Sequence, residues 1–137
     1  MVQFYFLSIV ANAFAGLILA GDYLSSRLKS LTIVKGIAEK KSVQFSVGIF
    51  ALLVGFLKLL IRSVNTDVPV VGDLLPALAG MGMGVALLLQ FFKESTQVPA
   101  DTLGKLEQLV MQYRVPLGLG GLAVSLLHFI LPAALFL

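Results

Sequence analysis

The sequence contains no cysteine and no tryptophan, and it has a single histidine. The absence of cysteine excludes a disulfide scaffold, a thiolate metal site and a cysteine nucleophile. Charge is also scarce: 12% of the residues are charged and 58% are hydrophobic, whereas soluble domains have about 25% charged residues. Intrinsic disorder is excluded as well, because disordered chains have few apolar residues and many charges. The 137 residues therefore predict a chain whose solvent is lipid rather than water.

Long stretches without charged residues make up most of the chain. Roughly 20 helical residues cross a hydrocarbon core about 30 Å thick, and four apolar segments meet this length. The predicted spans cover about residues 4–24, 43–61, 68–92 and 115–137. Strands of a membrane β-barrel would be shorter and would alternate apolar with polar residues, which these runs do not. The sequence predicts one all-α integral membrane domain over residues 1–137, with four transmembrane helices in a compact bundle.

The positions of the basic residues predict how the spans are oriented. A cleaved signal peptide has basic residues before its apolar stretch, but here they follow it, so we expect a retained first helix. Eight of the ten lysines and arginines lie in the first and third loops, and basic loops stay in the cytoplasm. We therefore expect a prokaryotic inner-membrane protein with both termini outside. Five basic residues are expected to contact anionic lipid headgroups at the inner face: Arg27, Lys29, Lys35, Lys40 and Lys41. These contacts account for the basic pI, so no nucleic-acid partner is expected.

The third loop has a helical pattern of its own. Four apolar residues recur there at helical spacing: Leu103, Leu106, Val110 and Tyr113. Polar residues lie opposite them, which predicts a short amphipathic helix on the inner membrane surface. Pro116 suits the first turn of the fourth span, where its missing N–H costs little. The first loop has a similar but weaker pattern over residues 31–38.

Small residues recur along one face of each predicted span. Hydrophobicity does not drive helices together in lipid, so they associate through close contacts of small residues and through hydrogen bonds. We expect six glycines to form such seams: Gly16, Gly48, Gly55, Gly80, Gly84 and Gly121. The seams serve either a compact bundle within one chain, or self-association and docking on a larger membrane protein. The sequence leaves both uses open.

Four polar residues lie in the outer half of the predicted spans: Asn12, Lys58, Asp73 and His128. Ionisable groups inside hydrocarbon are costly and indicate function by default. The hypothesis is a polar cluster that binds a solute or joins helices, in which Asp73 accepts a hydrogen bond from Lys58 or Arg62. Each residue also has a simpler explanation. Lys58 snorkels to the headgroups, Asp73 caps a helix, and the other two donate hydrogen bonds between helices.

No motif for catalysis, metal binding or cofactor binding is present. One histidine and scattered carboxylates do not form a metal site, and Ser125 and His128 have bundle spacing rather than a triad arrangement. We therefore expect no enzyme, no metal and no cofactor. Two functions remain. The one we favour is a non-catalytic accessory, assembly or scaffold subunit of a membrane complex. The alternative is a small homo-oligomeric transporter or channel that uses the outer polar cluster.

Overall fold

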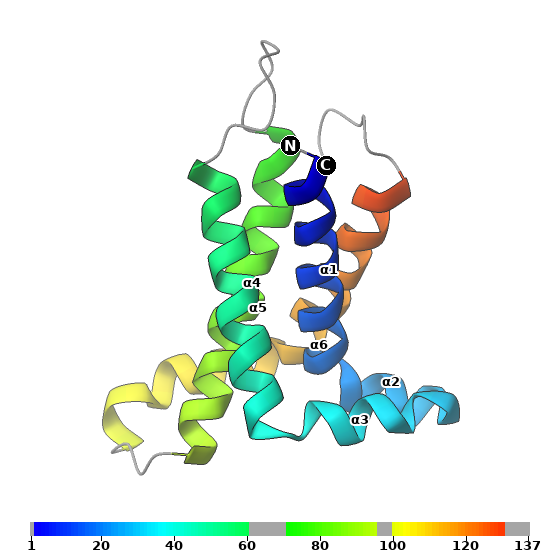
Figure 1. Cartoon of the computed structure of the whole chain (residues 1–137). Helices are drawn as coiled ribbons and strands as arrows, with labels where there is room; N and C mark the ends of the chain where they lie inside the picture. Colours follow the sequence, from blue (N-terminus) through cyan, green and yellow to red (C-terminus); the bar gives the residue numbers. More distant parts are fainter. Residues whose placement is uncertain (1, 61–70, 96–99, 131–137) are drawn as a thin grey trace.

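The described part of the chain is helical throughout. A computed structural model describes residues 2–60, 71–95 and 100–130, and no strand occurs within these ranges. The helices are α1 (Val2–Leu19), α2 (Gly21–Arg27), α3 (Thr32–Ala38), α4 (Lys41–Leu60), α5 (Val71–Ser95) and α6 (Ala100–Ile130), with a short 3₁₀ turn, η1, at Lys29–Leu31. Figure 1 shows α1, α4, α5 and the second part of α6 standing together as an upright bundle.

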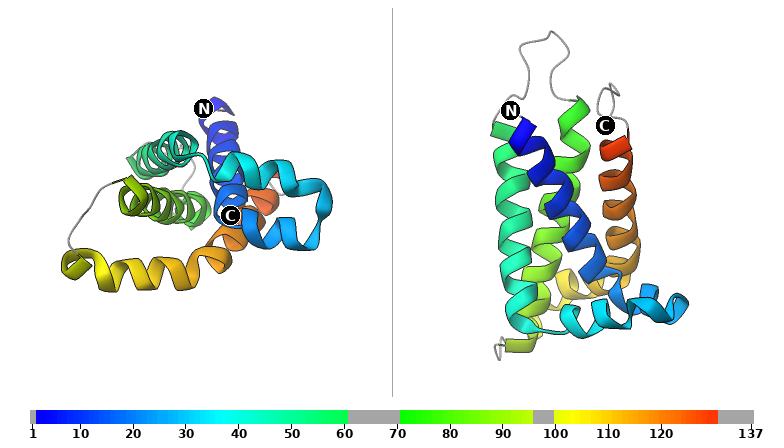
Figure 2. Two further views of the ribbon diagram at one scale, coloured as in Figure 1. Left: turned by 90° about the horizontal axis from the view of Figure 1, so that it is seen from below. Right: turned by 45° about the vertical axis from the view of Figure 1, so that its right-hand side comes forward.

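The bundle consists of two closely packed helix pairs. α4 has its largest contact with α5, α1 has its largest contact with α6, and α1 also touches both α4 and α5. The start of α1 and the end of α6 lie at one end of the bundle, which we call the head. At the other end, the foot, α2, α3 and the first part of α6 extend sideways (Figures 1 and 2).

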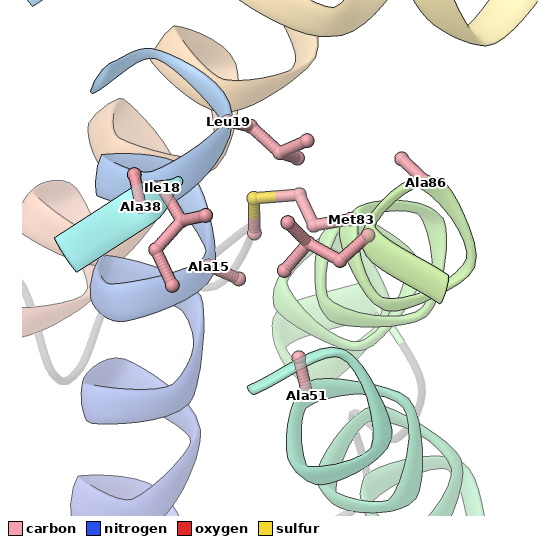
Figure 3. Packing of buried hydrophobic residues seen from close by; sticks show 8 residues of the cluster. Ala15, Ile18, Leu19, Ala38, Ala51, Met83 and Ala86 are labelled. Carbon is pink, nitrogen blue, oxygen red and sulfur yellow. The ribbon is translucent and has the colours of Figure 1, made fainter. Parts of the chain in front are cut away.

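A layer of buried apolar side chains joins the pairs. Its members come from α1, α3, α4 and α5: Ala15, Ile18, Leu19, Ala38, Ala51, Met83, Ala86 and Leu87. The Met83 side chain lies between α5 and α1 in Figure 3, and it is fully buried. Small alanines surround this longer, flexible side chain, so the helices approach closely while Met83 fills the remaining space.

The outward surface of the upright helices is apolar. Large exposed side chains occur on each of them, including Phe14 on α1, Leu53 on α4, Leu78 on α5 and Phe129 on α6. Three segments are long and apolar enough to cross a membrane: Lys41–Leu60, Leu74–Lys93 and Gly104–Ile130. α1 and α2 meet this criterion only as a pair. The fold is therefore compatible with a membrane location.

The structure corrects the predicted end of the first span. α1 ends at Leu19, and the chain bends by 70° into α2, so residues 21–24 leave the bundle instead of extending the span to residue 24. Ala20 has a non-helical conformation at the break. The polar segment that begins at Asp22 accounts for the bend, because Asp22 and Arg27 are exposed at the foot instead of being carried into an apolar bundle.

The structure also corrects the third loop. The predicted amphipathic helix and the fourth span form one helix, α6, and Pro116 lies inside this helix rather than in its first turn. A proline inside a helix removes one backbone hydrogen bond and kinks the helix. This accounts for the change of direction between the part of α6 that lies across the foot and the part that stands in the bundle (Figures 1 and 2).

Candidate functional site

A buried polar cluster lies at the head, between α1, α4 and α6. Lys58 is 6% exposed and His128 is 4% exposed, and Lys58 Nζ lies 3.0 Å from His128 Nε2. Which atom donates depends on the tautomer of the imidazole, and a Lys58 ammonium donates only to an Nε2 that carries no proton. The Tyr5 ring lies 4.7 Å from the imidazole, measured between centroids, and its hydroxyl donates to the His128 carbonyl oxygen. Three helices are thus tied together around one imidazole.

Asn12 contacts α5 instead of joining His128. It is 2% exposed, and its Nδ2 donates to the Pro76 carbonyl oxygen at 2.9 Å. Its Oδ1 faces Gly80, where a Cβ would lie 2.7 Å from that oxygen. Asn12 therefore occupies space that any larger residue at position 80 would need.

The remaining member of the predicted cluster is not placed. Residue 73 belongs to the backbone of α5, but the Asp73 side chain lies outside the described residues, and so does Arg62. The described part of the cluster therefore consists of Tyr5, Lys58 and His128, with Asn12 as a separate contact. Sequence reasoning did not include Tyr5 in this cluster. The signal available for it was a polar hydroxyl group on the same predicted span as Asn12.

The six predicted seam glycines all face other helices of the same chain. A Cβ at Gly84 would lie 2.7 Å from the Leu52 nitrogen, and one at Gly55 would lie 2.8 Å from the Ala77 oxygen, so α4 and α5 touch through their backbones. A Cβ at Gly16 would lie 2.8 Å from the Gly118 oxygen, which joins α1 to α6. The other three glycines also face side chains or backbone of neighbouring helices: Gly48, Gly80 and Gly121.

Charged residues gather at the foot. Asp22 of α2 lies 3.9 Å from Lys35 of α3 and 3.4 Å from Arg114 of α6, measured between charged atoms. Lys35 also lies 3.8 Å from Glu39. A further ion pair, between Lys93 and Glu107, joins α5 to the first part of α6. These pairs fix the sideways helices to the base of the bundle.

The five basic residues predicted to contact headgroups all belong to this end of the molecule. They lie on α2, η1 and α3, directly before α4 or at its first residue: Arg27, Lys29, Lys35, Lys40 and Lys41. Lys35 is engaged with carboxylates, and the Arg27 guanidinium carbon lies 5.6 Å from the centre of the Tyr23 ring. Exposed apolar side chains accompany them, the most exposed being Ile33 at 75%.

A cavity of about 280 Å³ lies at the foot. Its walls come from α2, α3, α4, α5 and α6: Asp22, Ala38, Glu39, Gln44, Gln90 and Arg114. Gln44 is 1% exposed and Gln90 is 6% exposed. Sequence reasoning treated both glutamines only as polar residues near span ends. The signal was a glutamine near the inner end of each of two apolar runs, but nothing in the sequence joined them to Arg114.

The described residues show no metal centre. Nowhere in them do three or more histidine, aspartate or glutamate side chains lie close enough together to hold a metal ion. The polar groups at the head are an amine, an imidazole, a phenol and an amide, and those at the foot are mainly carboxylates, amides and a guanidinium. These groups are suited to hydrogen bonding and to ion pairing.

The whole length of the chain resembles known sequences. A protein family without a functional description matches residues 1–128. The chain belongs to this family. An uncharacterised protein of Treponema pallidum (strain Nichols) is 35% identical over 139 residues, and the alignment covers 100% of both chains. No solved structure matches the chain. Neither the family nor the relative indicates an activity, so a functional proposal depends on the geometry described above.

Proposed function

We propose that the chain is a non-catalytic accessory, assembly or scaffold subunit of a membrane complex, with four spans and its foot on the cytoplasmic face. The observation that carries the proposal is the use of the polar side chains at the head. Lys58 contacts His128, Tyr5 donates to the His128 backbone, and Asn12 donates to the α5 backbone. Side chains used in this way hold helices together, as interhelical hydrogen bonds do in membrane bundles.

The apolar layer in the middle of the bundle supports the same proposal. Lys58 follows Gln44 by 14 residues on α4, which separates the head cluster from the foot cavity by about 21 Å. Met83 and Leu87 of α5 and Ala51 of α4 lie within this interval and are fully buried. The bundle is therefore packed between its two polar ends.

The proposed orientation is supported by the composition of the foot. Helices that lie in the membrane interface present apolar side chains to the acyl chains and basic side chains to the headgroups. Ile33 of α3 is 75% exposed, Leu28 is 52% exposed and Leu106 of α6 is 56% exposed. Basic residues adjoin two of them in the sequence: Arg27 and Lys29 flank Leu28, and Lys105 precedes Leu106. An anionic cytoplasmic leaflet would attract this end of the molecule.

Purification from native membranes in a mild detergent tests the proposed role. We expect a second chain in stoichiometric amount. The Ile33→Asn variant should recover less of that partner, because Ile33 is the most exposed apolar side chain of the foot, whereas the neighbouring control Thr32→Asn should recover as much as the native chain. Recovery of the chain alone, or only with copies of itself, contradicts the subunit proposal.

The alternative function is a small homo-oligomeric transporter or channel, and the burial of Lys58 with His128 is the observation that favours it. Ionisable side chains at membrane depth commonly mark solute or proton pathways. Reconstituted vesicles separate the two proposals. If Lys58→Met and His128→Ala abolish ion flux while the thermal midpoint in detergent is unchanged, the chain is a transporter. If both variants only lower the thermal midpoint, the head cluster is structural.

A further inference from the structure

Two buried polar atoms at the foot cavity have no hydrogen-bond partner within the described ranges: Gln44 Oε1 and Arg114 Nε. Gln44 Nε2 donates to the Ala38 carbonyl oxygen at 2.8 Å, which fixes the orientation of the amide and leaves Oε1 as a pure acceptor. Arg114 Nε is a donor. Buried polar atoms are almost always satisfied, because leaving one unpaired is costly. One unused acceptor and one unused donor at the same cavity therefore indicate a missing partner.

The charged groups around the cavity are only loosely paired. Asp22 Oδ2 lies 3.4 Å from Arg114 Nη1, and Glu39 Oε1 lies 3.8 Å from Lys35 Nζ. Strong charge-assisted hydrogen bonds between nitrogen and oxygen are about 2.7–2.9 Å long, so these pairs are longer than that. Both carboxylates keep acceptor capacity for further N–H donors, and the guanidinium keeps donor capacity for an oxyanion.

We propose that the foot cavity binds a small zwitterion. A primary ammonium group supplies three donors, which suit the carboxylates of Asp22 and Glu39 and the unused oxygen of Gln44. A carboxylate or phosphate oxyanion on the same molecule accepts from Arg114, a side chain well suited to both groups. The site thus requires opposite charges on one ligand, and this requirement separates it from a simple anion site.

The size of the cavity limits the ligand. Its 280 Å³ exceeds the cavity of about 150 Å³ that holds benzene, and it lies just below the range of about 300–1,000 Å³ typical of drug-sized ligands. A free amino acid fits this space, and so does the headgroup of an ethanolamine phospholipid; a nucleotide does not. The two sources share an ammonium group and an oxyanion. This ligand site goes beyond the scaffold role, which needs no bound small molecule.

Titration calorimetry on the purified full chain in detergent tests the proposal with four probes: glycine, phosphoethanolamine, phosphocholine and glycerol 3-phosphate. We expect saturable binding of at least one of the first two. Phosphocholine should bind more weakly than phosphoethanolamine because its trimethylated nitrogen has no N–H donor, and glycerol 3-phosphate should not bind because it has no cation. Glycine binding alone identifies a free amino acid as the source of the ligand. Phosphoethanolamine binding, with phosphatidylethanolamine retained during purification, identifies a lipid headgroup.

Two variants locate the site. Gln44→Leu removes the unused acceptor and Arg114→Gln removes the guanidinium, and each should weaken binding roughly tenfold or more. Gln112→Leu and Lys105→Gln are matched controls, since both residues are exposed and neither lines the cavity, and they should bind as the native chain does. The proposal is overturned if neither zwitterion binds, if phosphocholine or glycerol 3-phosphate binds equally well, or if both cavity variants keep native affinity. If a cavity variant fails to fold, the comparison of the four probes on the native chain still decides whether the chain binds a zwitterion.

Discussion

Replacing Gly84 with alanine tests whether backbone contact between α4 and α5 stabilises the bundle. A Cβ at this position would lie 2.7 Å from the Leu52 nitrogen and 2.8 Å from the Gly48 oxygen. Both are backbone atoms, so relief requires the two helices to separate. Overpacking of this kind costs about 1–3 kcal/mol, and alanine recovers up to about 1 kcal/mol through its better helix propensity. We expect the free energy of unfolding to fall by up to about 2 kcal/mol.

Gly120→Ala is the matched control for this experiment. In the described part of the chain, nothing outside the adjoining turns of α6 lies within 4 Å of a Cβ at Gly120, so only helix propensity acts and stability should rise by up to about 1 kcal/mol. Both variants are unfolded in mixed micelles with increasing sodium dodecyl sulfate, and helix content is followed by far-ultraviolet circular dichroism. A Gly84→Ala protein that is as stable as Gly120→Ala would refute the argument that α4 and α5 depend on glycine for their contact.

Three further predictions concern the polar groups and the orientation. Lys58→Met should lower the free energy of unfolding by about 1–3 kcal/mol, because it removes the buried contact between Lys58 Nζ and His128 Nε2. Lys105→Met, at an exposed position, should change it by less than about 0.5 kcal/mol in the same micelle assay. Glu107→Gln should cost at most about 1 kcal/mol, and less at high salt, because its ion pair with Lys93 is partly exposed; an equal loss at low and high salt would contradict this. The chain has no native cysteine, so a membrane-impermeant maleimide should label Gln3→Cys from outside intact cells and Ser30→Cys only in inverted vesicles; the reverse pattern would invert the proposed topology.

The long helices are the part of the fold that the sequence predicts well. The runs at 43–61 and 68–92 correspond to α4 at Lys41–Leu60 and α5 at Val71–Ser95, because an apolar run of this length has few alternatives to a buried or lipid-facing helix. The directions of the helix axes are not encoded in the same pattern. Hydrophobic periodicity shows which face is apolar, but it gives no sign of the 70° bend after Leu19.

The sequence predicts how far along the helices the residues of the candidate site lie, but it does not predict which of their side chains contact one another. Counting residues from the span ends places Lys58 and His128 in the same half, and the structure brings their side chains within 3.0 Å. Which side chain faces which depends on the rotation of each helix about its axis, so Asn12 meets Pro76 rather than His128. The foot cavity depends on the bends as well, since Asp22 and Arg114 meet only because α2 and α6 turn across the base.

The pairing of α1 with α6 imposes an order on biosynthesis. Gly118 follows Gly16 by 102 residues in the chain, yet a Cβ at Gly16 would touch its carbonyl oxygen. α1 therefore acquires its largest partner among the described helices only when α6 has been translated. A nascent chain that stalls before this point leaves the glycine-containing face of α1 uncovered. Synthesis of α6 is the step that covers this face of α1.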